Sequence, residues 1–392
     1  MTGGNPNRER LRCLVVTPWY PSARRPVEGI FVLDSARAIA RCHDVAVLFA
    51  EPAAPGGPPA RSDRIENSLR TVRIAFRPLP TARASLPLRL LALRAGLERL
   101  LCTGFRPDVL HAHVYLGGAG ALPLRRRLGA PLVVSEHLGS FIEGSVGGPQ
   151  RMLARYVFNH ADLVCPVSDE LARRLTALAP RARLQVVSNV VDTDLFHPSV
   201  ARAEGPPRLA VVAGLHPHKG VDQLLRALAQ LRERTPAVLE VAGDGPARAD
   251  LEALAHRLGI GTEVEFLGVQ DRAGVAALMR RADLLVVPSL AENQPVVLLE
   301  AQASGLPVVA SDVGGVREVV DSLAGRLVPS GDVDALAGAI EAVLAEPGHF
   351  DRSMIVMRAR ERYGQEAVAG RWDAIYRELI AARGASGSDG SG

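Results

Sequence analysis

The chain has 392 residues, a length that suits two domains better than one hydrophobic core. Its hydrophobic content of 47% excludes a largely disordered chain, and a formal net charge of +4, spread along the sequence, gives no support for nucleic-acid binding. No run reaches the roughly 18 uncharged apolar residues that a membrane span needs, and no apolar leader precedes the first predicted strand, so we expect a cytoplasmic protein. The four cysteines form no CxxC pair, and we expect neither a metal site nor a cofactor.

Apolar, β-branched runs alternate with segments of helical periodicity, which predicts parallel sheets with crossover helices. In the first half of the chain the predicted strands are 11–17, 45–50, 71–75, 109–111, 132–135, 163–166 and 184–187. After Asn189 the pattern breaks in VVDTDLFHPSVARAEGPP, which is rich in proline and turn formers. This segment predicts a linker, with a domain boundary near residue 200.

A second alternating series begins at residue 208 and predicts another α/β domain. Its predicted strands lie in RLAVVAG, AVLEVAG, VEFLG, DLLVVPS, LPVVAS and GRLVPS. The end of the chain predicts a final helix and then a tail of disordered composition, GASGSDGSG. The predicted organisation is therefore two Rossmann-like, doubly wound α/β domains facing a cleft. Its parts are 1–200, 201–365, a C-terminal helix at 366–383 and a disordered tail at 384–392.

Lys219 is the only lysine among 46 basic residues, all the others being arginine. It lies with Gly214 and Gly220 in the turn between the first strand and the first helix of the second domain. In open α/β sheets this is where ligands bind, because the amides at the helix N-terminus face an anion. The P-loop spacing fails, since Lys219 precedes its glycine and no Ser or Thr follows for magnesium. We predict metal-independent phosphate binding, with a structural turn as the alternative.

A second group of candidate residues lies in ENQPVVLLE, after the strand predicted in DLLVVPS. Pro295 is predicted in the first turn of the next helix, which leaves the amides of Val296 and Val297 without intrahelical partners. Glu292 precedes this helix and Glu300 lies inside it, so both carboxylates could reach the strand ends and accept hydrogen bonds from a sugar diol. The alternative is that both are solvated charges.

Gly314 and Gly315 follow another predicted strand in SDVGGVREVV. Two glycines allow a ligand to approach the backbone closely, although they equally suit an ordinary tight turn. The stretch LEVAGDGPAR resembles the start of a dinucleotide-binding fingerprint. It lacks the third glycine and lies on the second strand of its domain, which argues against a dehydrogenase.

Polar residues also stand at predicted strand ends in the first half of the chain. Glu28 and Gly29 open the first helix, HAH occupies residues 111–113, and Glu136 and His137 follow the next strand. A single histidine is more often a packing residue than a catalyst. Several polar residues at successive carboxyl ends of one parallel sheet favour a ligand site, because such sheets bind ligands at that edge.

Together these residues resemble a known family, the retaining family 4 glycosyltransferases of the GT-B fold. The resemblance runs through TPWYPS, EGIFV, HAH, SEH, PVSDEL, NVVDTDLF, GLHPHKG, ENQPVVLLEA and SDVGGVREVV, and so covers nearly the whole chain. Its most specific part is the Glu-x7-Glu pair of Glu292 and Glu300, preceded by the GxKG-like turn. TPWYPS with EGIF is similar to the branch that makes exopolysaccharides, capsules and wall polymers.

The resemblance implies a role for each candidate. Lys219 would hold the donor diphosphate, Glu300 the ribose hydroxyls and Glu292 the transferred hexose, while His137 would approach the reacting sugar. The two valine amides and the glycine turns would complete the donor site, and the final helix would cross back to the first domain. The chain also departs from the family, because no arginine stands shortly before Lys219 and the first glycine-rich loop offers only Gly29.

We therefore expect a retaining, metal-independent hexosyltransferase that uses a nucleoside diphosphate sugar, with UDP favoured over GDP. The acceptor would be a sugar, a lipid-linked sugar or a small molecule. The alternatives are a GT-B nucleotide-sugar epimerase and a non-catalytic protein that binds a sugar nucleotide. Leucines and arginines in 84–101 and three arginines at 125–127 could seat the first domain on an anionic membrane. An amphipathic helix packed on its own domain explains the segment 84–101 equally well.

Overall fold

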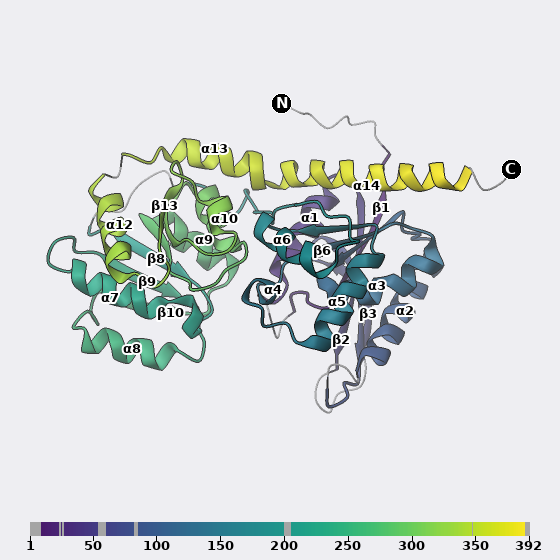
Figure 1. The fold of residues 1–392 in the computed structure, drawn as a ribbon, viewed down its shortest axis with the longest axis horizontal. Helices are drawn as coiled ribbons and strands as arrows, with labels where there is room; N and C mark the ends of the chain where they lie inside the picture. The colour runs from purple at the N-terminus through teal and green to yellow at the C-terminus, as the bar shows by residue number, and fades with distance from the viewer. Residues whose placement is uncertain are drawn as a thin grey trace. The chain divides into compact units, whose positions relative to one another are not determined.

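The computed structural model describes residues 9–22, 25, 27–53, 60–81, 85–199, 205–346 and 348–388. The chain forms two units, and the second is inserted into the first (Figure 1). Unit 1 comprises Met1–Asn189 and Gln365–Gly392, and unit 2 comprises Val190–Gly364. Unit 2 thus begins ahead of the boundary that the linker composition predicted near residue 200.

Unit 1 is built on a seven-stranded sheet with the order β3-β4-β2-β1-β5-β6-β7. Its strands are β1 (Arg12–Thr17), β2 (Asp44–Pro52), β3 (Arg61–Glu66), β4 (Leu69–Phe76), β5 (Val109–His113), β6 (Leu132–Glu136) and β7 (Leu163–Pro166). The neighbouring strands are parallel except for β3, which pairs antiparallel with β4.

The helices of unit 1 lie between these strands. They are α1 (Ile30–Ala40), α2 (Leu86–Cys102), α3 (Val114–Leu128), α4 (Ser140–Glu143), α5 (Gly148–His160), α6 (Asp169–Leu178) and, from the end of the chain, α14 (Gln365–Ser388). Helix α1 packs against α14, whereas α2 packs against α3 and α3 against α5. Helices on both faces leave the parallel strands without a solvent-facing side, which explains the continuous apolar stretches of β1, β2 and β7.

Unit 2 contains a six-stranded parallel sheet with the order β10-β9-β8-β11-β12-β13. Its strands are β8 (Arg208–Val212), β9 (Val238–Ala242), β10 (Val264–Gly268), β11 (Leu284–Val287), β12 (Val308–Ser311) and β13 (Gly325–Val328). Its helices are the 3-10 turn η1 (Pro217–Lys219), α7 (Val221–Leu231), α8 (Arg248–Arg257), α9 (Arg272–Arg281), α10 (Val296–Ala303), α11 (Val316–Val319), α12 (Val333–Ala345) and α13 (Arg352–Tyr363).

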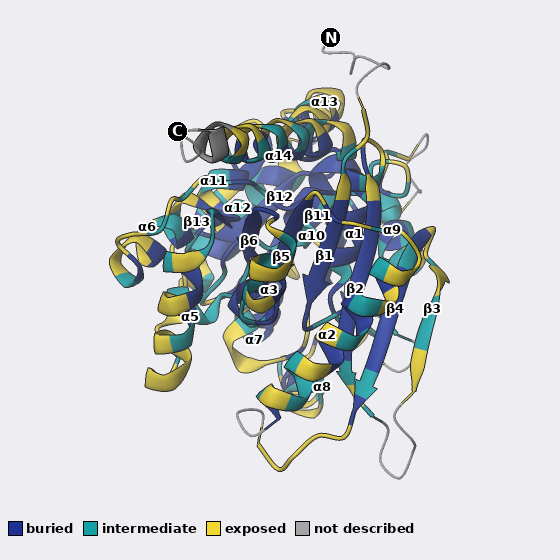
Figure 2. Ribbon diagram, turned by 90° about the vertical axis from the view of Figure 1, so that its right-hand side faces the viewer, coloured by how far each residue is buried: buried dark blue, intermediate teal, exposed yellow. Residues whose placement is uncertain are grey.

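The hydrophobic cores lie against the sheets. Two buried clusters in unit 2 account for the two faces of its sheet, one with α7, α8 and α12 and the other with α9, α10 and α13. Figure 2 shows the central strands buried and the outer helix faces exposed. The predicted pair of doubly wound α/β domains is confirmed.

Three local features differ from the sequence-based expectation. Strand β3 was not predicted, because RSDRIE has no apolar run and occupies an exposed sheet edge. The predicted strand at 184–187 lies beside β7 but forms only the isolated bridge between Leu184 and Val164. Helix α14 continues to Ser388, so the expected tail at 384–392 is helical at its start, since an established helix adds one hydrogen bond per further residue. Residues 389–392 lie outside the described residues.

No helix in the described part of the chain is both long enough and apolar enough to cross a membrane.

Candidate functional site

The turn after β8 brings Lys219 against the loop that follows β11. Gly220 has φ of +64°, and a Cβ atom there would lie 2.1 Å from the backbone oxygen of Pro288. Only glycine tolerates both the left-handed conformation and this close approach. In addition, the backbone N–H of Leu290 donates to the carbonyl oxygen of His218 (2.8 Å). The two loops are therefore held together by the backbone itself.

Lys219 and Glu292 form an ion pair at the meeting point of these loops. The lysine Nζ lies 2.6 Å from Glu292 Oε1, and the hydroxyl of Ser289 donates to the same oxygen (2.8 Å). The side chains of Lys219 and Glu292 are 22% and 12% exposed. A lysine and a carboxylate with this much exposure remain reachable by a ligand while water screens them only in part.

A cavity of about 220 Å³ contains this pair. It is lined by the ends of β8 and β11 and by six of the predicted site residues, namely Gly214, Lys219, Glu292, Pro295, Val296 and Val297. The order of the sheet reverses between β8 and β11, and open α/β sheets bind ligands at such a switch point. The sequence therefore identified residues that the fold does bring together.

The N-terminus of helix α10 lines one end of the cavity. Pro295 caps the helix with φ of −64°, and the helix begins at Val296. The first amides of a helix have no intrahelical acceptor, so those of Val296 and Val297 are suited to an anion. The cavity thus combines one cation, one carboxylate and a helix N-terminus.

Three predicted donor-site residues of unit 2 do not line this cavity. Glu300 lies inside α10 and is half-buried. Gly314 has φ of +51° and Gly315 caps α11, in a turn that an ion pair between Asp312 and Arg317 closes (2.7 Å). The positive φ accounts for Gly314 structurally, whereas Gly315 has an ordinary φ of −86°, and the contact of both with a donor stays a prediction.

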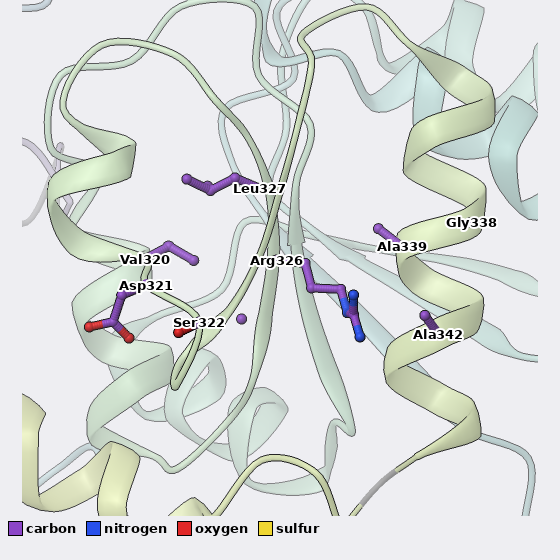
Figure 3. Close-up of a pocket in the computed structure, with 9 residues that line it drawn as sticks. Val320, Asp321, Ser322, Arg326, Leu327, Gly338, Ala339 and Ala342 are labelled. Atoms are coloured by element: carbon purple, nitrogen blue, oxygen red, sulfur yellow. The ribbon is translucent and has the colours of Figure 1, made fainter.

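A larger cavity of about 530 Å³ lies elsewhere in unit 2, between the edge strand β13 and α12 (Figure 3). Its charged side chains are Asp321 and Arg326. Asp321 already pairs with Arg358 (2.7 Å) and accepts hydrogen bonds from the amides of Leu323 and Ala324. No predicted site residue lies in this cavity, so we place the candidate site at Lys219.

In unit 1, Gly29 precedes α1 in a position that only glycine fits. Its φ is +75°, and a Cβ atom would lie 2.6 Å from the backbone oxygen of Trp19, in the segment after β1. Because β1 and β5 flank the point where the strand order of this sheet reverses, Gly29 belongs to the edge where ligands bind in such sheets. Its predicted contact with phosphate stays a prediction.

His137 follows β6 and is hydrogen-bonded through both ring nitrogens. Its Nε2 lies 3.1 Å from His113 Nδ1, and its Nδ1 lies 2.9 Å from Asn189 Oδ1. Burial lowers the pKa of His137 to about 4, and the hydrogen bond with Asn189 acts in the opposite direction. The ring of Phe31 lies against that of His137, with 4.4 Å between centroids. His137 is therefore a neutral imidazole held on three sides.

Glu136 holds the backbone of the loop that contains His137. Its fully buried carboxyl group accepts hydrogen bonds from the backbone N–H groups of Tyr115, His137 and Leu138. Burial raises its pKa to about 7, although these hydrogen bonds act in the opposite direction. The carboxyl group fixes the backbone at the end of β6 and has no exposed surface for a substrate.

Two residues of these sites were not singled out from the sequence. Ser289 lies three residues before Glu292, and a hydroxyl so close to a candidate carboxylate could have been noticed as its hydrogen-bond donor. Asn189 lies 52 positions from His137 and reaches it only through the fold. No spacing rule could have found that contact. Within the described ranges, no group of three or more His, Cys, Asp or Glu residues is arranged to hold a metal ion.

Two family models together match most of the chain. Residues 29–190 match the family model described as glycosyl transferase 4-like domain, and residues 192–367 match glycosyl transferases group 1. The D-inositol 3-phosphate glycosyltransferase of Mycolicibacterium paratuberculosis is 33% identical over 348 residues, which are 81% of this chain and 77% of the relative.

Solved structures share the fold. Sucrose-phosphate synthase from Thermosynechococcus elongatus superposes with a TM-score of 0.78 at 22% identity, over 95% of this chain and 100% of that one. Anabaena HepE, solved in complex with UDP-glucose, superposes with a TM-score of 0.71 at 20% identity, over 95% and 100% of the chains.

Proposed function

Because this chain belongs to the family 4 glycosyltransferases, we propose that it moves a hexose from a nucleoside diphosphate sugar to an acceptor hydroxyl, with retention of configuration and without a metal ion. The observation that carries the proposal is the cavity at the β8–β11 switch point, where the single lysine of the chain faces the N-terminus of α10. These are the groups that a leaving diphosphate needs.

In the proposed reaction the bond between the anomeric carbon and the diphosphate oxygen breaks, and the bond to the acceptor oxygen forms on the same face of the sugar. The acceptor proton passes to the departing diphosphate, so no protein nucleophile is required. Lys219 and the amides of Val296 and Val297 stabilise the charge that develops on the leaving group. Glu292 accepts hydrogen bonds from the transferred hexose and Glu300 from the ribose, and we assign His137 a contact with the hexose.

The ion pair between Lys219 and Glu292 has a consequence for binding. Lys219 Nζ lies 2.6 Å from Glu292 Oε1, so we expect a diphosphate to compete with this carboxylate for the ammonium group. Glu292 then loses a partner and becomes available to the sugar hydroxyls. Donor binding would thus rearrange one lysine and one carboxylate together.

For the donor we propose UDP-hexose ahead of GDP-hexose, and we choose UDP-glucose as the first compound to test. HepE, which shares the fold, was solved with that ligand. The acceptor panel should include D-inositol 3-phosphate, because relatives carry that compound in their names. It should also contain simple sugars and a lipid-linked sugar, since the sequence is similar to the branch that makes envelope polysaccharides.

We further propose that the enzyme works in the cytoplasm in glycan or glycoconjugate synthesis, and that any membrane contact is peripheral. Helix α2 leaves little of its apolar face for such a contact. Leu93 and Leu97 are buried in the core of unit 1, and Arg99 pairs with Asp63 (3.2 Å), so these residues serve the helix's own domain. Sedimentation with anionic liposomes tests the idea, and absence of binding at low salt would remove it.

The deciding experiment titrates UDP, GDP and ADP into the purified protein by calorimetry, with EDTA present, beside a Lys219→Ala variant. We expect one nucleotide to bind and the variant to bind it more weakly. Absence of binding for all three would refute the proposal. Conversion of UDP-glucose without an acceptor would instead indicate an epimerase, and binding without turnover on any acceptor would indicate a non-catalytic protein.

A further inference from the structure

The rings of three histidines form a continuous row from the core of unit 1 to the end of β6. His111 and His113 stack with 4.6 Å between centroids, and His113 and His137 follow with 5.3 Å. His111 and His113 are buried, whereas His137 is half-buried and ends the row. Its outer neighbour is Phe31. The row therefore presents one imidazole at the ligand-binding edge of the sheet.

The hydrogen bonds along the row allow two arrangements of protons. If His137 Nδ1–H donates to Asn189 Oδ1, then His137 Nε2 must accept, and His113 Nδ1–H donates to it. His113 Nε2 then carries only a lone pair. In the reverse arrangement, His137 Nε2–H would donate to His113 Nδ1, and the remaining proton of His113 would lie on Nε2.

The surroundings of His113 select between these arrangements. Its Nε2 is buried and has no hydrogen-bond partner among the described residues. An N–H group buried without an acceptor is rarer and less tolerated than an unused acceptor. The first arrangement is therefore favoured, and the orientation of the Asn189 amide, with Oδ1 towards the ring, agrees with it.

We propose that Asn189 and His113 are positioning residues that hold His137 as a neutral imidazole protonated on Nδ1. Both ring nitrogens of His137 are then engaged inside unit 1, so His137 transfers no proton in the reaction. It contributes a fixed ring surface, backed by Phe31, against which the sugar is placed. That last statement rests on the proposed function, whereas the protonation state is a property of the protein alone.

Asn189 has a further property that makes it suited to this task. It is the last residue of unit 1 before the chain enters unit 2 at Val190. Its side chain is buried, so the hydrogen bond to His137 also fixes the chain at the point where it leaves the unit. A substitution there would release the ring and the chain exit together.

The first test measures the protonation state by NMR on the full chain labelled with ¹⁵N-histidine, with His137→Gln and His113→Gln variants to assign the signals. At pH 7.5 we expect the long-range ¹H–¹⁵N pattern of an Nδ1–H tautomer for both residues. An Nε2–H tautomer or a charged ring at His137 would overturn the proposal. This result does not depend on whether the protein transfers a sugar.

The second test compares Asn189→Leu, which removes the acceptor, with Asn189→Asp, which keeps one. We expect kcat to fall by roughly 10- to 100-fold in the leucine variant with the donor KM within about twofold, because a displaced group weakens the chemical step. The aspartate variant should recover most of the loss. Asn159→Leu is the matched control and should retain the wild-type kcat, since Asn159 Oδ1 is buried without a partner.

The outcomes of the second test separate the two proposals. Equal kcat values for wild-type protein and Asn189→Leu, with the variant folded by its melting curve, would overturn the positioning role. Wild-type protein that transfers no sugar from any donor would refute the proposed function, and the NMR result would still decide the protonation state.

Discussion

Glu292→Gln should make the protein bind UDP more tightly, although it removes a residue of the candidate site. The ammonium group of Lys219 lies 2.6 Å from Glu292 Oε1, and a diphosphate must compete with that carboxylate. Glutamine keeps the size of the side chain and an oxygen that can accept from Ser289, but it carries no charge. The lysine is then fully available to the diphosphate. The substitution also removes the negative charge of Glu292, which would repel the diphosphate.

The magnitude follows from how far the pair is shielded from water. Exposed ion pairs contribute about 0–1 kcal/mol, whereas two charges 4 Å apart in a medium of effective dielectric 20 interact by about 4 kcal/mol. With 22% and 12% exposure the pair lies between these limits, and we take about 1.5 kcal/mol, which corresponds to roughly 10-fold tighter UDP binding. For UDP-glucose the gain should vanish, because a charge-assisted hydrogen bond to the sugar, worth about 1.5–3 kcal/mol, is lost.

Calorimetry with UDP and UDP-glucose, at low and high salt, measures both changes. Lys219→Met should weaken UDP binding, and in that background Glu292→Gln should give a smaller gain because no lysine remains to be released. Glu341→Gln serves as the control, since Glu341 lies in helix α12, pairs with Arg234 (3.7 Å) and does not line the cavity that contains Lys219. Weaker UDP binding by Glu292→Gln, or an unchanged preference between UDP and UDP-glucose, would refute the reasoning.

Three further predictions concern stability, each measured by chemical denaturation. Gly220→Ala should lower the free energy of unfolding by at least about 3 kcal/mol, because the new Cβ would meet a backbone oxygen at 2.1 Å and φ is +64°; Gly338→Ala, in α12 with no atom within 4 Å, should instead add up to about 1 kcal/mol. Tyr376→Phe should lower it by about 1–3 kcal/mol, because the hydroxyl lies 2.6 Å from Nδ1 of buried His111, and no loss would show that the nitrogen finds another partner. Between pH 7.5 and pH 5.5, His111, His113 and His137 should together lower the free energy of unfolding by about 4 kcal/mol. Burial lowers their pKa values, so over this range the unfolded chain takes up protons that the folded chain does not. Glu136, whose pKa burial raises to about 7, should restore about 2 kcal/mol over the same range, so these four groups together give a net loss of about 2 kcal/mol. Burial also lowers the pKa of His43, which acts in the direction of further loss, so a net gain in the free energy of unfolding on acidification would contradict the prediction.

The sheets were predictable because parallel strands buried on both faces are largely apolar, as β8, β11 and β12 are in their central residues. The same rule missed β3, a mostly polar strand at the edge of its sheet. The donor-site candidates were predicted from glycine and proline residues in turns, because these residue types favour particular backbone conformations. Gly220 and Pro295 both adopt the conformations that their residue types favour.

Contacts between distant side chains were not predictable. Lys219 and Glu292 are 73 positions apart, and their direct pairing follows from the adjacency of β8 and β11, which alternation alone does not specify. The same holds for Asn189 and His137. Strand order is decided by packing across the whole domain. A single sequence therefore indicates which residues belong to a site more readily than it indicates which of them contact each other.

The insertion of unit 2 into unit 1 sets an order of events during synthesis. The ribosome synthesises most of unit 1 before unit 2. Unit 1 is nevertheless completed last, because α14 follows all of unit 2. Until α14 emerges, α1 lacks the helix that packs against it, and His111 lacks both the hydroxyl of Tyr376 and the ring of Trp372. A nascent chain stalled before Gln365 would therefore hold a finished unit 2 beside an unfinished unit 1 with an open apolar face, which is the kind of surface that chaperones and proteases recognise.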